Sequence, residues 1–564
     1  MEVDQQMDGT FDAAFYLTAY ADVAASEIDP WQHYIRFGRN EGRAANAAEL
    51  RFAELESFDA AYYLQSNPDV AAAAVSPYEH YFRFGKAEGR RAARPPEVTQ
   101  SAEAREAAAA GYPKFDGAFY FEAFPDIAAS GMTALDHYLK YGRYEGRVTH
   151  ALDVAAQWRP HGCDPQRDTV MVVTHNGSRT GAPILAFNVC KELAKRMNVI
   201  AVLLAGGPLV GHFHQVCSQT LVLDEPEMRH PLVLEYLVRE IDARVEVRHA
   251  IVNSSESRMM VPPLAAHGYR VALLIHEYVS YMHSRAATVE AIKHATRVVF
   301  SAQSVRDDAL DDDTREALAS SVILRQGKST IPLRSAAIAS AAPAASAAAA
   351  QSETAAAMPD SADRVQALLD GATPRPRLVL GGGTVQFRKG VDLFFGTAAE
   401  FGRRFPDLDA IFVWVGDDDG SDLSFTACLD MQLETIRKRG GHAYLMLPTE
   451  RLESLYALAD VFFLSSRMDP MPNVAIDAMT AGLPVVCFDG AGGMAEILRE
   501  SASQYAGVVS FGNIAEAADR IGDLIRDSGR RKEIWEENRR LARQMFDMQS
   551  YVSALVGLLW DAEV

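Results

Sequence analysis

Short apolar runs rich in β-branched residues alternate with longer amphipathic stretches over most of the chain beyond residue 168. This alternation is typical of parallel strands covered by helices, because strands buried on both faces are apolar throughout. The runs form two series separated by a break. The expected strands are 169–174, 199–204, 220–223, 250–253, 271–275 and 298–301, then 378–381, 410–415, 443–447, 461–464 and 484–488. The pattern predicts an α/β protein with two facing Rossmann-like domains, at residues 165–334 and 376–545.

The break between the two series has the composition of a linker. Residues 335–357 are almost all Ala and Ser, so they cannot supply a hydrophobic core. We expect residues 335–375 to form the interdomain linker, as a hinge or a marginal surface helix. Beyond the second series, residues 546–564 carry an apolar helical face. Because ligands of open α/β sheets bind beyond the carboxyl ends of the strands, the two domains should enclose a cleft.

Three near-copies of one unit, at about residues 11–43, 58–90 and 115–147, occupy the first 150 residues. Each unit begins with Phe-Asp, contains a His-Tyr pair at the same offset, and ends in Gly-x-x-Glu-Gly-Arg. We expect two short helices per unit, stacked into an all-α repeat module that precedes the α/β domains. The histidines His33, His80 and His137 lack a second ligand at metal-binding spacing, which favours packing or capping over a metal site.

Composition and charge narrow the class of protein. The chain has 564 residues and a net charge of −20, which opposes a broad nucleic-acid-binding surface. Its five cysteines are scattered without a CxxC pair, so neither a disulfide framework nor a cysteine zinc site is indicated. The acidic amino terminus lacks the layout of a secretory signal, and no apolar stretch is long enough to span a bilayer. We expect a cytoplasmic protein without a transmembrane segment and with at most peripheral contact with the inner face of the membrane.

Glycine-rich loops follow the expected strands of the first domain, where a ligand of the cleft would bind. The loop at residues 174–183 opens a helix at Ile184, and at Gly181 the backbone can approach a bound anion closely. Residues 206–209, which include Gly207, form another tight turn after the second strand. His276 follows the fifth strand, and its position is as consistent with a structural role as with a catalytic one.

The second domain carries cations and carboxylates at the corresponding edge of its sheet. Residues 381–390 lack the last glycine of a dinucleotide fingerprint and contain Arg388 and Lys389, which favours cation pairing to a diphosphate over a solvated basic turn. Asp469 lies in a Pro-rich loop, a helix begins near Asn473, and Asp477 follows one turn later. Such carboxylates can accept hydrogen bonds from sugar and ribose hydroxyls while the helix N-terminus holds a phosphate. This arrangement predicts a sugar-nucleotide site.

From about Asp168 onward, the chain resembles the retaining family 4 glycosyltransferases of the glycosyltransferase-B fold. Residues 467–485 are close to the Glu-x7-Glu signature of that family, and residues 178–183, 206–209, 276–277 and 388–392 match its other landmarks in order. In this family the last helix packs back across the domains. Both family glutamates are aspartates here, and Thr384 stands where many members have a phosphate-binding arginine.

The resemblance implies roles for residues of both domains. The implied catalytic residues are His276, Asp469, Arg388 and Lys389. The residues implied to bind the donor are Gly181, Arg388, Lys389, Asp469, Met471, Pro472, Asn473, Val474 and Asp477, with residues 471–474 offering backbone N–H groups. Those implied to lie on the acceptor side are Arg179, Thr180, Gly181 and Gly207. In this scheme the two cations bind the diphosphate, Asp469 holds sugar hydroxyls, His276 contacts the transferred sugar, and Asp477 holds the ribose.

Three functions remain open at this point. The first is metal-independent transfer of a sugar, with retention and without a cofactor, from a nucleotide-diphosphate sugar to a glycan, lipid-linked or protein acceptor. The second is a catalytically weakened scaffold that binds a nucleotide sugar and contacts partners through its repeats, which the two aspartates favour. The third keeps the fold but is a nucleotide-sugar epimerase or a phosphorylase.

The carboxylates of residues 417–419 suggest a metal site, but their place after a Rossmann strand favours a solvated loop.

The repeats resemble Phe-Asp-x-x-x-Tyr-Leu units that accompany some bacterial glycosyltransferases and cell-surface proteins. This resemblance implies an accessory module that binds a protein partner or a second copy of the chain. It says little about the chemistry of the protein.

Overall fold

The computed structural model describes residues 111–330, 332, 360–418, 420, 422–500 and 507–560, and before them residues 13, 16, 17, 23, 29–34, 67, 70, 80, 81 and 106–108. The chain divides into two compact units, Met1–Glu106 and Ala107–Val564. The third repeat therefore belongs to the same unit as the two α/β domains. Most of the first repeat and nearly all of the second lie outside the described residues.

A buried tyrosine contacts a histidine in the first and in the third repeat. In the first repeat, α3 (Pro30–His33) begins after an Asp29 cap, and the Tyr16 hydroxyl lies 3.3 Å from His33 Nδ1. In the third repeat, the Tyr120 hydroxyl lies 3.0 Å from His137 Nδ1. Burial raises the pKa of Tyr120 to about 12, so its phenol remains protonated and shares this hydrogen bond with the ring nitrogen. The histidines therefore contribute to repeat packing.

The third repeat forms three short α-helices and a π-helical turn around a small aromatic core. They are α9 (Gly117–Ala123), α10 (Pro125–Ala128), α11 (Ala134–His137) and η3 (Tyr138–Gly142). Asp116 caps α9 by accepting hydrogen bonds from the backbone N–H groups of Ala118 and Phe119. The expectation of two helices per unit is therefore too simple for this repeat, because Pro125 starts a new helix directly after α9.

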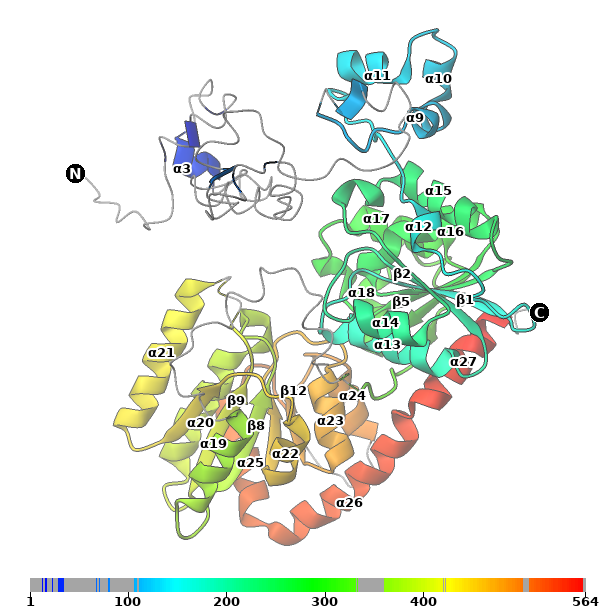
Figure 1. The fold of residues 1–564 in the computed structure, drawn as a ribbon. Helices are drawn as coiled ribbons and strands as arrows, with labels where there is room; N and C mark the ends of the chain where they lie inside the picture. Colours follow the sequence, from blue (N-terminus) through cyan, green and yellow to red (C-terminus); the bar gives the residue numbers. More distant parts are fainter. Residues whose placement is uncertain are drawn as a thin grey trace. The chain divides into compact units, whose positions relative to one another are not determined.

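Two parallel sheets with helices on both faces form the α/β domains (Figure 1). The first sheet has the order β3-β2-β1-β4-β5-β6-β7 and the second β10-β9-β8-β11-β12-β13. The strands are β1 (Thr169–Thr174), β2 (Asn198–Leu203), β3 (Gln219–Val222), β4 (His249–Asn253), β5 (Arg270–Ile275), β6 (Arg297–Phe300) and β7 (Val322–Ile323), then β8 (Arg377–Gly382), β9 (Ala410–Val415), β10 (His442–Met446), β11 (Val461–Leu464), β12 (Val485–Phe488) and β13 (Val508–Val509). The predicted fold class is confirmed, and each predicted strand is present within about one residue at each end.

Amphipathic helices connect the strands. In the first domain they are α13 (Gly181–Leu193), α14 (Val210–Val216), α15 (Pro231–Asp242), α16 (Val261–Ala266), α17 (Arg285–His294) and α18 (Gln303–Ala309). In the second they are α19 (Ser361–Asp370), α20 (Val391–Arg404), α21 (Leu423–Lys438), α22 (Leu452–Leu458), α23 (Asn473–Ala481), α24 (Gly493–Glu500) and α25 (Ile514–Arg526), followed by α26 (Ser528–Met545) and α27 (Met548–Trp560). Residues 333–359, which hold the Ala/Ser-rich part of the expected linker, lie outside the described residues. The last part of that linker forms α19, which buries Val365 and Leu369 in the core of the second domain.

The last helix returns to the first domain. Tyr551, Leu555 and Leu559 of α27 are buried in the core beside α13 and the first sheet. Arg270 Nε donates to the Leu559 carbonyl at 2.7 Å, and the rings of His249 and Trp560 stack. The segment after the second domain therefore ties the two α/β domains together.

The third repeat packs on α15 of the first domain. Phe119 is buried in the main core, and its ring lies 5.4 Å from that of Tyr236 on α15. Ion pairs between Glu122 and Arg239 and between Lys114 and Glu225 flank this contact. No helix within the described residues is long and apolar enough to cross a membrane.

Candidate functional site

The N-termini of α13 and α23 face each other across the two domains. A Cβ atom at Gly181, the first residue of α13, would lie 3.3 Å from Asn473 Nδ2, on the first residue of α23. Neither N-cap residue, Thr180 or Pro472, makes a side-chain cap, so backbone N–H groups remain at both helix ends. Two helix N-termini at one point favour a negatively charged ligand.

The basic turn of the second domain presents two cations in different settings. Lys389 Nζ donates to Asp469 Oδ2 at 2.6 Å, and both side chains are largely buried. Ser466 Oγ donates to the same carboxylate oxygen at 3.2 Å. Arg388 is exposed and donates only to Gln386, at 3.1 Å, within the described part of the chain. The structure brings Lys389 and Asp469 together and leaves Arg388 open to a ligand.

Arg467 fixes this turn to the loop that carries Asp469. Its guanidinium forms two hydrogen bonds to Asp392, of 2.8 and 2.6 Å, and lies over the Phe387 ring at 3.8 Å. Gly390 has φ +66°, and any side chain there would collide with the Ser465 carbonyl. The turn is therefore held in place before any ligand binds.

The Asp469 loop is supported from behind by a glycine turn that follows β12. The Asp469 N–H donates to the Ala491 carbonyl at 2.8 Å, and a side chain at Gly492 would collide with the Asp469 carbonyl. Met471 is buried beside this turn. Pro472 has no N–H, so the predicted set of backbone donors at 471–474 is corrected to exclude it. Val474, in the first turn of α23, accepts a hydrogen bond from the Tyr456 hydroxyl through its carbonyl at 3.1 Å.

Asp477 lies one turn into α23 in a largely buried position. Burial raises the pKa of its carboxyl to about 6, while Lys328 lowers the pKa and Glu453 raises it further. Lys328 Nζ lies 3.7 Å from Asp477 Oδ1. This carboxylate therefore has a cation beside it but still loses its charge in mildly acidic conditions.

His276 presents an unpartnered nitrogen at the carboxyl end of β5. Asn253 donates through Nδ2 to the Ala182 carbonyl at 2.9 Å, so its Oδ1 is left to accept from His276 Nε2 at 3.2 Å. Burial lowers the pKa of His276, so the ring is neutral at pH 7. With the proton on Nε2, Nδ1 carries a lone pair, and within the described residues this buried atom has no hydrogen-bond partner. The nitrogen can accept a hydrogen bond from a ligand hydroxyl.

The loops predicted to form the acceptor side pack on each other. The Gly177 N–H lies 3.1 Å from the carbonyl oxygens of both Ala205 and Gly206, and a side chain at Gly207 would collide with the Gly177 backbone. Ser178 and Thr180 share a hydrogen bond of 2.8 Å between their hydroxyls. Arg179 forms an ion pair of 3.4 Å with Glu450 of the second domain. These contacts place the loop at the boundary between the two domains.

The acidic run after β9 forms a turn. Asp418 accepts from Thr426 at 2.7 Å and from the Gly420 backbone at 3.0 Å, and Asp419 lies outside the described residues. Among the residues whose placement is described, no group of three His, Cys, Asp or Glu could hold a metal ion.

Sequence reasoning missed several residues that build the site. Glu496 of α24 accepts hydrogen bonds from the backbone N–H groups of Gln303 and Ser304 in the other domain, at 2.9 and 2.8 Å. Gln326 donates to Asn473 Oδ1 at 2.6 Å, and Lys328 pairs with Asp477. The glycine turn after β12 follows the rule that functional loops lie beyond strand ends, so that rule could have found it. Nothing in the local sequence marks Gln326 or Lys328.

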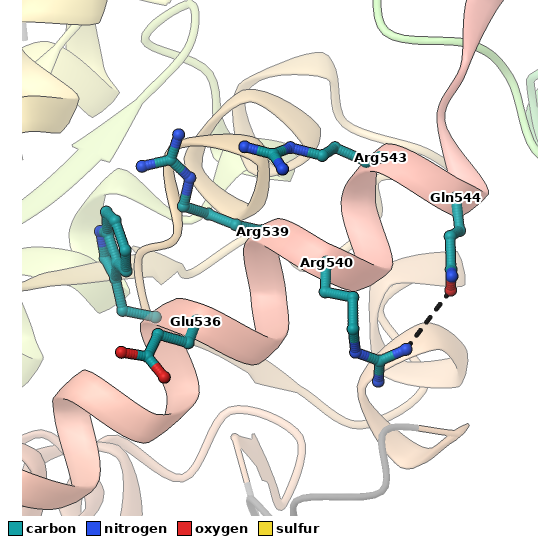
Figure 2. Close-up of a pocket in the computed structure, with 6 residues that line it drawn as sticks. Glu536, Arg539, Arg540, Arg543 and Gln544 are labelled. Atoms are coloured by element: carbon teal, nitrogen blue, oxygen red, sulfur yellow. Dashed lines mark hydrogen bonds between the residues drawn. The ribbon is translucent and has the colours of Figure 1, made fainter.

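A surface hollow on α26 lies apart from this site (Figure 2). It is lined by Trp535, Glu536, Arg539, Arg540, Arg543 and Gln544. Arg539 lies over the Trp535 ring at 4.4 Å, and Trp535 packs against Gly482 just beyond the C-terminal end of α23. The candidate site is at the other end of that helix.

The chain has two α/β domains, each built on a parallel sheet, and the loops beyond the carboxyl ends of the strands meet between the domains. This arrangement defines a protein of the glycosyltransferase-B fold. Residues 375–527 match the family model described as "Glycosyl transferases group 1". Among solved structures, HepE of Anabaena in complex with UDP superposes with a TM-score of 0.54 at 16% identity, over 70% of this chain and 100% of that one. A glycosyltransferase from Rickettsia africae gives a TM-score of 0.55 at 14% identity, over 70% and 98%. At these identities the likeness is one of fold.

Two curated relatives are similar to this chain over only part of their own length. Spore coat protein SA of Bacillus subtilis is 26% identical over 186 residues, which are 32% of this chain and 48% of that protein. D-inositol 3-phosphate glycosyltransferase of Corynebacterium urealyticum is 30% identical over 151 residues, which are 26% and 35%. The matched part therefore spans about half or less of each of these relatives.

Proposed function

We propose that this protein is a glycosyltransferase that moves a sugar from a nucleoside-diphosphate sugar to an acceptor hydroxyl with retention of configuration. The observation that carries the proposal is the meeting of the α13 and α23 N-termini beside Arg388 and the Lys389–Asp469 pair. A diphosphate bound there would contact helix ends from both domains and an exposed guanidinium. The group 1 glycosyltransferase match over residues 375–527 and the fold neighbour solved with UDP support the same reading.

The site residues divide the chemistry between them. The acceptor oxygen bonds to the anomeric carbon as the bond from that carbon to the phosphate oxygen breaks, and the acceptor proton passes to the leaving phosphate. Arg388, Lys389 and the two helix ends stabilise the charge that develops on the leaving diphosphate, in the role for which other enzymes use a metal ion. The neutral His276 accepts from a hydroxyl of the transferred sugar through Nδ1, and Asp469 holds other hydroxyls of that sugar. Asp477 accepts from the ribose.

The acceptor belongs to the first domain in this proposal. Arg179, Thr180 and Gly207 border the face on which a glycan, lipid-linked or protein acceptor would lie. The N-terminal repeats would bind a partner or a second copy of the chain.

Nucleotide binding tests the proposal directly. A thermal-shift panel with UDP, GDP, ADP and TDP should show a rise in melting temperature with one class, because a ligand of the native state stabilises it. Arg388→Ala should weaken that nucleotide about 10- to 100-fold, since hydrogen bonds to charged groups contribute roughly 1.5–3 kcal/mol. Arg437→Ala, an exposed arginine on α21 of the same domain, is the matched control. Equal binding by all three proteins would refute the diphosphate assignment.

A second candidate function is a scaffold that binds the nucleotide sugar without turning it over. The environment of Asp469 favours this function, because Oδ2 of its carboxylate already accepts hydrogen bonds from Lys389 and Ser466. Its side chain is also one methylene shorter than the family glutamate. The two candidates are separated by incubating the bound nucleotide sugar with the protein. Release of free sugar or transfer to an added acceptor identifies the enzyme, whereas an unchanged donor identifies the scaffold.

A further inference from the structure

A short segment after β7 contacts α23 and α13 of the nucleotide site and the junction between α26 and α27. We refer to residues 326–330 as the interdomain segment. Gln326 is buried and donates to Asn473 at the start of α23. Thr330 exchanges two hydrogen bonds with Asn188 of α13, of 2.9 and 3.0 Å. The Lys328 N–H donates to the Phe546 carbonyl between α26 and α27 at 2.8 Å. The interdomain segment is therefore anchored on both sides of Lys328.

The anchoring fixes where the Lys328 side chain can reach. Gly327 runs so close to Met548 that any side chain at that position would meet its Cα atom. With its backbone fixed, Lys328 directs Nζ toward α23, to 3.7 Å from Asp477 Oδ1. The two side chains are 34% and 20% exposed, so the pair is partly shielded from water and ionic screening is reduced.

Asp477 faces few other charged groups. Glu453 and Tyr456 face it from α22, and the negative charge of Glu453 opposes that of Asp477. From α26, Trp535 packs against Gly482 and Asn538 donates to the Leu483 carbonyl, both just beyond the end of α23. Within the described residues, Lys328 is the cation that pairs with Asp477.

We propose that Lys328 is a positioning residue for the nucleotide, which keeps the Asp477 carboxylate charged and oriented to accept hydrogen bonds from the ribose hydroxyls. This inference rests on the proposed function and adds a residue from the first domain to a site in the second. It makes nucleotide affinity depend on pH through Asp477. A protonated carboxyl is a weaker acceptor than a carboxylate, so affinity falls as pH falls through the pKa of that group, which is about 6.

Removing the lysine should move this dependence to higher pH. In Lys328→Met, burial and Glu453 still raise the pKa of Asp477, but the opposing charge is gone. The midpoint of the affinity loss should rise by about one pH unit. The variant should then bind nucleotide about twofold more weakly than the wild type at pH 7 and up to about tenfold more weakly below pH 6, and the two should converge at about pH 8.5. Lys328→Arg should restore the wild-type profile, and Lys191→Met, at an exposed lysine on α13, should leave it unchanged.

The experiment is calorimetric titration of the full chain with the tightest binder among UDP, GDP, ADP and TDP, from about pH 5.5 to 8.5. The set of proteins is wild type, Lys328→Met, Lys328→Arg, Lys191→Met, Asp477→Asn and the Lys328→Met/Asp477→Asn double variant. Both proteins with Asp477→Asn should keep only the pH dependence that comes from the nucleotide's own terminal phosphate, whose second pKa is about 6, and the double variant should show no additional pH effect of Lys328→Met. An unchanged midpoint in Lys328→Met would overturn the inference. A loss of affinity by the same factor at every pH would also overturn it, because Lys328 would then contact the nucleotide itself.

Thermal melts without nucleotide separate this inference from the proposed function. The pKa of Asp477 is higher in the folded chain than its ordinary value of 3.8, so its contribution to stability is full below about pH 3.8 and is lost as pH rises through about 6. Lys328→Met should shift that loss upward, whether or not nucleotide binds. If this shift is seen but the wild type binds no nucleoside diphosphate at any pH, the proposed function fails and the ribose role of Lys328 falls with it. If the wild type binds and neither profile shifts, only the role of Lys328 is refuted.

Discussion

At the scale of single residues, the Lys389–Asp469 pair is the most consequential contact in the site. Each charge is largely removed from water, and their 2.6 Å hydrogen bond compensates part of that loss. Ser466 satisfies a further lone pair of the carboxylate. A diphosphate bound beside Lys389 would take the place of Asp469 as the partner of the lysine. A sugar hydroxyl bound beside Asp469 would take the place of Lys389 as the partner of the carboxylate. The pair therefore keeps both groups charged and placed until the donor binds.

Breaking this pair from one side should be costly. Lys389→Met leaves Asp469 as an unpaired buried carboxylate, for which we expect a loss of roughly 3–5 kcal/mol. For a domain of this size each kcal/mol lowers the melting temperature by about 2–4 °C. The Lys389→Met/Asp469→Asn double variant should recover much of the loss, since no isolated charge remains. Differential scanning calorimetry of the two single variants and the double variant measures this coupling, and strictly additive losses would show that the two residues do not interact.

The candidate site was predictable where it follows strand ends and unpredictable where it depends on distant segments. His276 comes directly after β5, and Asp469 and Asn473 lie in the loop and helix start that follow β11, so the rule for parallel sheets predicts all three at the ligand-binding edge. Lys328 and Gln326 belong to an irregular segment whose contacts exist only because Asn188 and Phe546 anchor it. No local pattern encodes that anchoring.

At the scale of elements, the strands were predictable because β-branched runs buried on both faces have a distinctive composition. The two edge strands β7 and β13 were not predicted, because each has only two residues and neither periodicity nor composition marks so short a run. In the third repeat, a proline inside an aromatic stretch splits one expected helix into two. Short elements follow tertiary contacts more than their own sequence.

The N-terminus of helix α18 is capped by a residue of the other domain. Its N-cap residue Ala302 has no side chain that could accept from the first N–H groups, and Glu496 of α24 takes that role with both carboxylate oxygens. A carboxylate at a helix N-terminus is also favoured by the helix dipole. Glu496 therefore contributes to the contact between domains as well as to α18.

Replacing this interdomain cap should destabilise the protein measurably. Glu496→Ala removes both acceptors, and the usual effect of losing a cap is about 0.5–2 kcal/mol, seen as a fall of a few degrees in melting temperature. Glu496→Gln keeps one carbonyl oxygen, so its melting temperature should lie between those of the wild type and Glu496→Ala. Glu500→Ala on the same helix removes an exposed pair with Arg325 and should change stability by less than about 1 kcal/mol. If the Glu496 and Glu500 variants melt alike, the cap makes no special contribution.

At the scale of the whole molecule, the third repeat is integrated into the compact unit that holds the two α/β domains. Phe119 joins the main core and meets Tyr236 on α15, and two ion pairs lie beside it. The compact unit accordingly begins at Ala107 and not at the first α/β strand. The module predicted at residues 1–150 is thus divided, with one repeat serving as part of the first domain.

The docking of this repeat can be tested in the full chain with a single substitution. Phe119→Ala removes a ring that is 4% exposed, for which burial and packing together predict a loss of roughly 3–5 kcal/mol at that contact. Amide exchange measured by mass spectrometry should then increase over α15, where the repeat packs, while β8 and β9 of the second domain stay protected. Tyr144→Ala is the matched control, because that aromatic of the same repeat is 75% exposed and its loss should change stability by about 0.5 kcal/mol or less. Unchanged exchange over α15 in Phe119→Ala would mean that the repeat is held by its ion pairs alone, and a Glu122→Gln variant would then be expected to release it.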